Sequence, residues 1–190
     1  MMRLQLGFPG VFTLVQPDEY YSAVTMHGMI MVIFMLTAFF LGGFGNLLIP
    51  LMCGARDMAF PYMNMLSYWV YLASVIVLCA SFFVPEGATG AGWTLYPPQA
   101  ISEGTAGSGM GIILMLVSLA LFIVAFTMGG LNYITTAFQS RTRGMTLMRM
   151  PLSVWGIIMA TILGLLAFPA LLVASIMMLL DAVLGTSFFM

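Results

Sequence analysis

The stretch MGIILMLVSLALFIVAFTMGGLNYITT, residues 110–136, decides the fold. It contains no charged residue and exceeds the roughly 20 residues that cross a bilayer as a helix. The whole chain of 190 residues has the same character, because 62% of its side chains are hydrophobic, 6% are charged and the mean hydropathy is +1.10. This composition leaves too little polar surface for a water-soluble globule. The sequence therefore predicts an integral membrane protein.

Charged residues divide the chain into four uncharged runs, each long enough to cross a bilayer. They predict an all-α fold, a polytopic transmembrane helix bundle, with spans at about 20–52, 64–84, 110–136 and 151–180. We treat residues 1–190 as a single transmembrane segment, and we expect a kink near Pro169. The long glycine-rich loop 85–109 is predicted to be functional, since loops of this length in compact domains usually are.

The arginines predict the orientation of the bundle. Arg56, Arg141, Arg143 and Arg149 lie in the two loops at one end, whereas the loop 85–109 carries only acidic residues. The positive-inside rule places the arginine loops on the cytoplasmic side or its organellar equivalent, with both termini outside. Arg3 is the one basic residue that falls on the other side.

Several classes of function are excluded by composition. A net charge of −1 with five basic residues offers no clustered positive surface, so no nucleic acid is expected as a partner. Cys53 and Cys79 are predicted at opposite membrane faces, which makes a disulfide implausible. The 20 methionines are scattered through apolar helices, which favours packing over a copper site.

His27 is the only histidine, and it lies inside the first predicted span. Ionisable groups in a membrane are costly and tend to be functional, and imidazole commonly binds a metal or haem iron. On an ideal helical wheel, Phe34, Ala38 and Gly45 share its face, which would suit a flat macrocycle. The alternative is a structural histidine that donates to a neighbouring carbonyl.

A second group of polar residues gathers towards the inner side. Asp57 follows Arg56, and Asn46, Asn64 and Asn132 lie near it on different spans. Such groups could order waters that lead protons inward. The alternative is that the asparagines join helices and that Asp57 is a solvated loop acid. Trp93 and Tyr96 in the outer loop are either interfacial aromatics or donors to an anionic ligand.

Six strings, taken in order, closely resemble subunit I of the haem–copper oxidases, of the cytochrome c oxidase type. They are Thr25-Met26-His27-Gly28, Gly42-Gly43-Phe44-Gly45-Asn46, Gly54-Ala55-Arg56-Asp57-Met58-Ala59-Phe60-Pro61, Gly92-Trp93-Thr94-Leu95-Tyr96-Pro97-Pro98, Leu131-Asn132-Tyr133-Ile134-Thr135-Thr136 and Pro151-Leu152-Ser153-Val154-Trp155. Their order and spacing resemble those of the family over essentially the whole chain.

The resemblance implies roles for individual residues. His27 would be one axial ligand of the low-spin haem iron, Arg3 would hydrogen-bond a haem substituent, Tyr20 would lie nearby, and Trp93 would lie near the propionates. Asp57, Asn46, Asn64 and Asn132 would form the entrance and lining of the D proton pathway. The paired serines expected higher in that pathway are replaced by Ala125 and Phe126, and Thr127 is only a partial substitute.

The resemblance also implies what this chain lacks. It matches helices two to five of a twelve-helix subunit, and the second haem and the copper are expected only with later helices, so no catalytic residue is expected here. We therefore expect a fragment or a split piece of subunit I that is inactive alone. Expected partners are the rest of subunit I, subunits II and III, and cytochrome c as electron donor.

The expected whole is a proton-pumping oxidase that reduces oxygen to water. It would lie in a bacterial plasma membrane or, as the alternative, a mitochondrial inner membrane. A quinol oxidase of the same superfamily is the nearest alternative function. A non-catalytic transporter or assembly protein is the alternative from another class.

Overall fold

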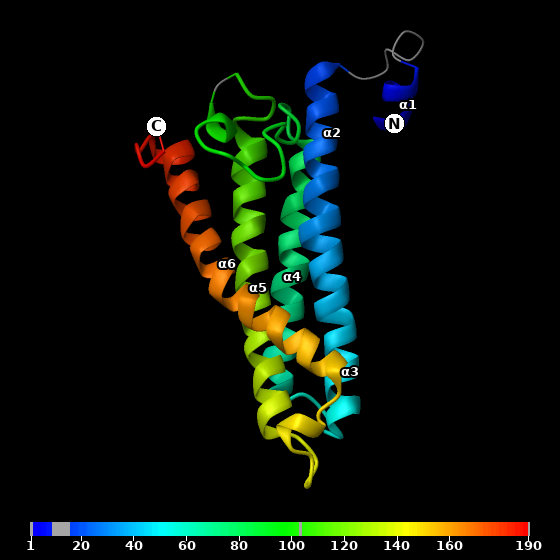
Figure 1. The fold of residues 1–190 in the computed structure, drawn as a ribbon. Helices are drawn as coiled ribbons and strands as arrows, with labels where there is room; N and C mark the ends of the chain where they lie inside the picture. Colours follow the sequence, from blue (N-terminus) through cyan, green and yellow to red (C-terminus); the bar gives the residue numbers. More distant parts are fainter. Residues whose placement is uncertain (1, 9–15, 103, 190) are drawn as a thin grey trace.

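The computed structural model describes residues 2–8, 16–102 and 104–189, and these residues form a bundle of long helices (Figure 1). The helical elements are α1 (Met2–Gly7), α2 (Pro17–Met29), the π-helix η1 (Ile30–Phe44), α3 (Gly45–Cys53), α4 (Pro61–Ala80), the 3-10 turns η2 (Ser81–Phe83) and η3 (Gln99–Ile101), α5 (Met110–Gln139), the 3-10 turn η4 (Leu147–Arg149) and α6 (Leu152–Leu184). No strand occurs among these residues.

Four of the helical stretches are long and apolar enough to cross a membrane. They run over Pro17–Cys53, Pro61–Phe83, Met110–Gln139 and Leu152–Leu184. This confirms the all-α class and the four spans, and each observed span is within a few residues of its expected limits. The chain termini and the loop after α4 lie at one end of the bundle (Figure 1).

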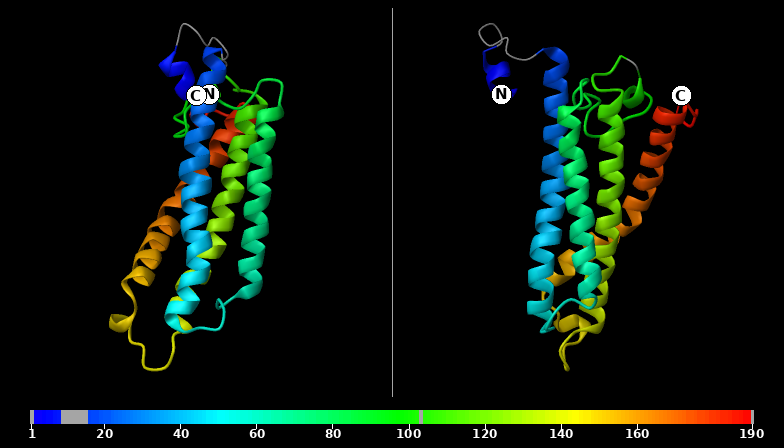
Figure 2. Two further views of the ribbon diagram at one scale, coloured as in Figure 1. Left: turned by 90° about the vertical axis from the view of Figure 1, so that its right-hand side faces the viewer. Right: turned by 180° about the vertical axis from the view of Figure 1, so that it is seen from behind.

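The helix α5 is the centre of the bundle. Half of its most apolar window is buried, against at most 17% for the corresponding windows of the other spans. The helices α2, α4 and α5 run side by side, whereas α6 crosses them obliquely and bends along its length (Figures 1 and 2). The bent helix α6 contains Pro169, the residue at which the sequence predicts a kink. A proline inside a helix removes a backbone hydrogen bond and so favours a bend.

The first span changes its helical geometry midway, which the sequence analysis did not anticipate. Residues Ile30–Phe44 form a π-helix, whose hydrogen bonds reach five residues back and therefore reduce the rotation per residue. The expected common face of His27, Phe34 and Gly45 is consequently wrong. Phe34 and Gly45 are buried against α4 and α5, whereas His27 is exposed.

The helix α3 ends in a Schellman motif. Gly54 adopts a positive φ of 70°, Ala55 N donates to Pro50 O at 2.9 Å, and Gly54 N donates to Leu51 O at 3.4 Å. A Cβ at Gly54 would also collide with the Thr142 side chain from the loop before α6. Glycine is therefore required both by the turn and by the close approach of that loop.

Candidate functional sites

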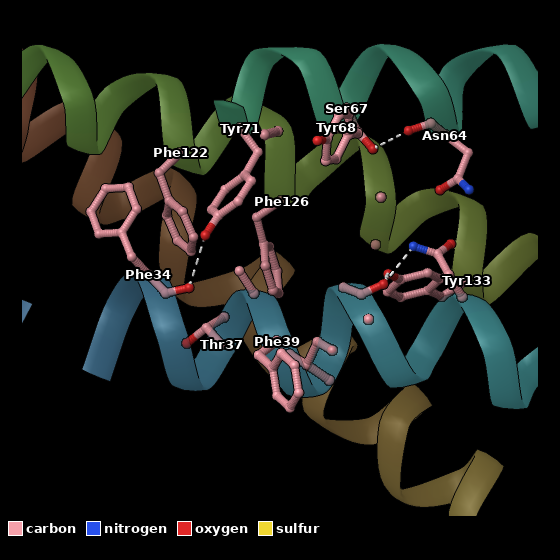
Figure 3. A pocket seen from close by; sticks show the side chains of 18 of the residues that line it. Phe34, Thr37, Phe39, Asn64, Ser67, Tyr68, Tyr71, Phe122, Phe126 and Tyr133 are labelled. Carbon is pink, nitrogen blue, oxygen red and sulfur yellow. Dashed lines mark hydrogen bonds between the residues drawn. The ribbon is translucent and has the colours of Figure 1, made fainter. Parts of the chain in front are cut away.

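A cavity of about 910 Å³ lies between η1 and α3 on one side and α4 and α5 on the other (Figure 3). Asp57, Asn46 and Asn64, which the family resemblance predicts as pathway residues, all line it. They come from the α3–α4 loop, from α3 and from α4. The fold thus brings three of the four predicted pathway residues around one space.

Asn46 carries an unsatisfied polar atom beside this cavity. Its Nδ2 donates to Gly42 O at 2.6 Å, but its buried Oδ1 has no hydrogen-bond partner among the residues that the structure describes. A buried amide oxygen without a partner is costly, and ordered water is the usual partner for such groups. The atom is therefore suited to accept a hydrogen bond from water in the cavity.

Asp57 and Asn64 both line the cavity but differ in exposure. Asp57 is exposed, and its Oδ1 accepts a hydrogen bond from Met58 N at 2.7 Å. Asn64 is half-buried on the first turn of α4, where Ser67 Oγ donates to its carbonyl at 2.7 Å (Figure 3). Asp57 is the carboxylic acid among the residues that line the cavity, and its side chain is exposed.

Asn132 does not line the cavity. It is 0% exposed, its Oδ1 accepts from Phe60 N at 2.9 Å, and its Nδ2 donates to Phe60 O at 3.2 Å. Thr136 Oγ1, one turn further along α5, accepts from Ala59 N at 2.9 Å. These contacts fix the end of the α3–α4 loop, so Asn132 acts here by holding the segment that carries Asp57.

Two residues that depart from the expected serine pair face the cavity from α5. Ala125 and Phe126 both line it, and the Phe126 ring packs edge-on against Phe168 with centroids 4.6 Å apart. Thr127 donates to Ile123 O at 2.8 Å within its own helix and does not line the cavity. The part of the cavity wall that Ala125 and Phe126 of α5 form is therefore apolar.

Cavity-lining hydroxyls on α4 and η1 were missed by the sequence analysis. Tyr71 Oη donates to Phe34 O at 3.1 Å, and Thr37 Oγ1 donates to Val32 O at 3.2 Å (Figure 3). A signal for Tyr71 was present, because Asn64 and Tyr71 are seven residues apart and so share one face of an α-helix. No comparable signal existed for Thr37, since its orientation depends on the π-helix.

The second candidate site is the exposed surface of α2 around His27. Within the described part of the chain, the imidazole makes no hydrogen bond, so no carbonyl there accepts from it. Val24 and Met31, three residues before and four after His27, are 42% and 43% exposed. The imidazole, which has no hydrogen-bond partner among the described residues, thus lies in the middle of an apolar strip.

Trp93 is brought next to this strip by the outer loop. A Cβ at Gly28 would lie 3.1 Å from three atoms of Trp93, so the indole packs directly on the α2 backbone beside His27. Gly92 N also donates to Thr25 Oγ1 at 2.9 Å, which ties the loop to α2. Trp93 remains 46% exposed and can therefore still contact another group.

Tyr20 and Arg3, the other two residues predicted to contact the haem, do not pack beside His27 as Trp93 does. Tyr20 is half-buried on the first turn of α2, seven residues before His27 and hence on the same helix face. Arg3 is exposed on α1, which lies beside the start of α2 and outside the bundle (Figure 1). The structure therefore places Tyr20 and His27 on one face of α2, with Trp93 of the outer loop packed on the same helix, but does not join Arg3 to them.

The fold and the two sites define a polytopic helical membrane protein with a cavity between its helices and an exposed histidine on its first span. Over residues 1–190 the chain matches the family described as cytochrome c and quinol oxidase polypeptide I, and it belongs to that family. It is therefore an integral membrane protein of the haem–copper oxidase subunit I type.

Three curated relatives show how far the similarity extends. The chain is 70% identical to the alternative cytochrome c oxidase subunit 1 of Bradyrhizobium diazoefficiens, covering all of this chain and 32% of that protein. It is 42% identical to a heme-copper oxidase subunit I+III of Aeropyrum pernix and 38% identical to cytochrome c oxidase subunit 1 of Eremothecium gossypii. In both cases all of this chain is covered, together with 23% and 35% of the relative. The chain thus spans about a third or less of these relatives.

Proposed function

We propose that this chain forms part of subunit I of a proton-pumping terminal oxidase. It would supply the entrance of a proton pathway and, through His27, a ligand of the low-spin haem iron, while the haem and copper at which oxygen is reduced would be held by other helices. The observation that carries the proposal is the cavity that joins Asp57, Asn46 and Asn64.

The cavity has the features needed for proton entry. Asp57 is exposed and can exchange protons with water, whereas asparagine amides do not change charge at neutral pH. The unpartnered Asn46 Oδ1 can anchor an ordered water inside. Protons would thus be collected at Asp57 and passed along waters held by the amides, while Asn132 holds the loop in position.

The residues around His27 fit one face of a haem. A neutral imidazole is a common iron ligand, and His27 is exposed, lacks a partner among the described side chains and is flanked by apolar residues. The indole N–H of Trp93 is a donor suited to an anionic edge group. The bound haem supplies reversible one-electron chemistry. In this chain His27 would hold the iron, and Trp93 and Tyr20 would orient the ring.

Cytochrome c is the electron donor that we propose for the whole enzyme. The relatives that are 70% and 38% identical are named cytochrome c oxidases. A quinol donor is the alternative, since the family description covers both classes. Subunits II and III are the proposed partners, and a bacterial plasma membrane is the proposed location, in line with the Bradyrhizobium relative.

Proton uptake in single-turnover reoxidation of the assembled oxidase tests the entrance. Asp57→Asn keeps the size and most hydrogen bonds of the side chain but removes the titrating group. We expect uptake to slow by about a hundredfold or more, the lower end of a typical general acid–base contribution, with unchanged haem spectra. Glu86→Gln, at an exposed position on the loop after α4, is the control and should leave uptake unchanged. Wild-type uptake in Asp57→Asn would reject the entrance.

A further inference from the structure

The cavity continues past the predicted pathway residues. Asn64 and Ser67 lie towards one end in Figure 3, and Tyr71 and Phe34 lie towards the other. At a rise of 1.5 Å per residue, Tyr71 is about 10 Å further along α4 than Asn64. A proton that enters at Asp57 therefore has further to travel inside the same space.

Oxygen atoms in this farther part come from α4 and η1. Tyr71 Oη and Thr37 Oγ1 each donate a hydrogen bond to a backbone carbonyl of η1, at 3.1 Å and 3.2 Å. A hydroxyl that donates to a carbonyl keeps lone pairs with which it can accept from water. Both groups are thus fixed acceptors on the cavity wall.

The facing part of α5, at Ala125 and Phe126, presents no side-chain hydrogen-bond acceptor to this part of the cavity. Ala125 has no polar atom, and the Phe126 ring is held by Phe168 and Phe122, with centroids 4.6 Å and 6.4 Å away. Thr127 bonds its own helix and lies outside the cavity lining. A water chain needs polar partners at each step, so the α5 wall cannot order one here.

We propose that the proton-conducting water chain runs from Asn64 along Tyr71 and Thr37, between α4 and the π-helix, rather than along α5. This inference rests on the proposed proton entrance at Asp57. Roughly three waters, spaced about 2.8 Å apart, would bridge the ~10 Å between Asn64 and Tyr71. Each water occupies about 30 Å³ of liquid volume, which the cavity easily accommodates. Tyr71 and Thr37 are positioning residues, because they orient water without changing charge.

Proton uptake during single-turnover reoxidation of the assembled oxidase tests this route. Tyr71→Phe and Thr37→Val remove one hydroxyl each while keeping the side-chain volume. We expect each to slow uptake about fivefold to tenfold, as for loss of one hydrogen bond to water, with haem spectra unchanged. Thr37→Ser keeps a hydroxyl at this position and should show the wild-type rate. Tyr62→Phe, on the same helix at a side chain that is 91% exposed, should have no effect.

The outcomes separate this route from the entrance itself. If Asp57→Asn slows uptake while Tyr71→Phe and Thr37→Val keep the wild-type rate, the route is wrong and the entrance stands. If Asp57→Asn also keeps the wild-type rate, the proposed entrance fails. If Tyr71→Phe alters the haem spectra, Thr37→Val decides: slowed uptake with recovery in Thr37→Ser supports the route, and wild-type uptake overturns it.

Discussion

The side chain of Asn132 on α5 holds the backbone at Phe60, just before α4. Its amide pairs with both backbone groups of Phe60, at 2.9 Å and 3.2 Å, in a position that is 0% exposed. Phe60 immediately precedes α4 and lies three residues after Asp57. The asparagine thus contributes to the cavity mouth indirectly, by fixing the backbone that carries the acid.

Replacing Asn132 by alanine should therefore lower stability. Two hydrogen bonds are lost, each with a net value of about 1 kcal/mol, so we expect the free energy of unfolding to fall by roughly 2 kcal/mol. Unfolding of the detergent-solubilised protein, followed by helical circular dichroism, measures the change. Gln139→Ala, at an exposed position near the end of α5, should change stability by less than about 0.5 kcal/mol. Equal stabilities of the two variants would contradict a stabilising role for the hydrogen bonds between Asn132 and Phe60.

The polar residues of the cavity mouth could be predicted from the sequence, but their hydrogen bonds could not. Asn46 and Asn64 stand out because polar groups are rare in apolar spans, and Asp57 is the acid in the short loop between those spans. Asn132 stands out equally, yet its partner lies 72 residues away along the chain, and only tertiary packing reveals it. Tyr71 was overlooked because tyrosine in a span usually reads as packing, and its role depends on the carbonyl that Phe34 presents.

At the scale of elements, the outer loop is docked on α2. Thr25 is 2% exposed, and its Oγ1 accepts the hydrogen bond of Gly92 N at 2.9 Å. The next residue in the loop, Trp93, packs on Gly28. The position of Trp93 beside His27 therefore depends on a hydrogen bond two residues before the histidine.

Thr25→Val should loosen this docking. Valine has nearly the same shape as threonine but leaves the backbone N–H of Gly92 without its acceptor, at a cost of about 1–3 kcal/mol. We expect the loop 85–109 to be cleaved faster in limited proteolysis by a protease with broad specificity. Thr94→Val, at an exposed position in the same loop, should leave the cleavage rate unchanged. Identical cleavage in both variants would show that the hydrogen bond does not hold the loop.

The spans could be predicted from hydropathy because an apolar run of this length has few other structures available in a membrane. The internal geometry of the first span could not. An α-helical wheel assumes constant rotation per residue, and Ile30–Phe44 departs from it as a π-helix. The expected common face of His27, Phe34 and Gly45 was therefore wrong beyond Met29, although His27 itself lies in regular α-helix.

At the scale of the whole molecule, the orientation in the membrane remains a prediction from arginine placement. The loop after α4 and the loop before α6 lie at opposite ends of the bundle (Figure 1). Cys53 is buried and Cys79 is exposed, so the native thiols differ in accessibility as well as in position. Matched engineered thiols test the orientation more cleanly.

Thr94→Cys and Thr146→Cys place single thiols at exposed positions in these two loops, with both native cysteines replaced by serine. Because the arginine-bearing loop is predicted to face inward, an impermeant maleimide added to right-side-out vesicles should label Thr94→Cys. Thr146→Cys should be labelled only after permeabilisation. The reverse pattern would overturn the orientation.

The central claim, that this chain supplies an axial haem ligand to an oxidase, is tested most directly by one spectrum. The assembled oxidase with His27→Ala should lose the low-spin six-coordinate haem bands, because His27 is the only histidine in this chain. Thr94→Val, in the neighbouring loop, serves as the control and should keep them. Full low-spin intensity in His27→Ala would contradict the assignment of the ligand and with it the proposed haem site.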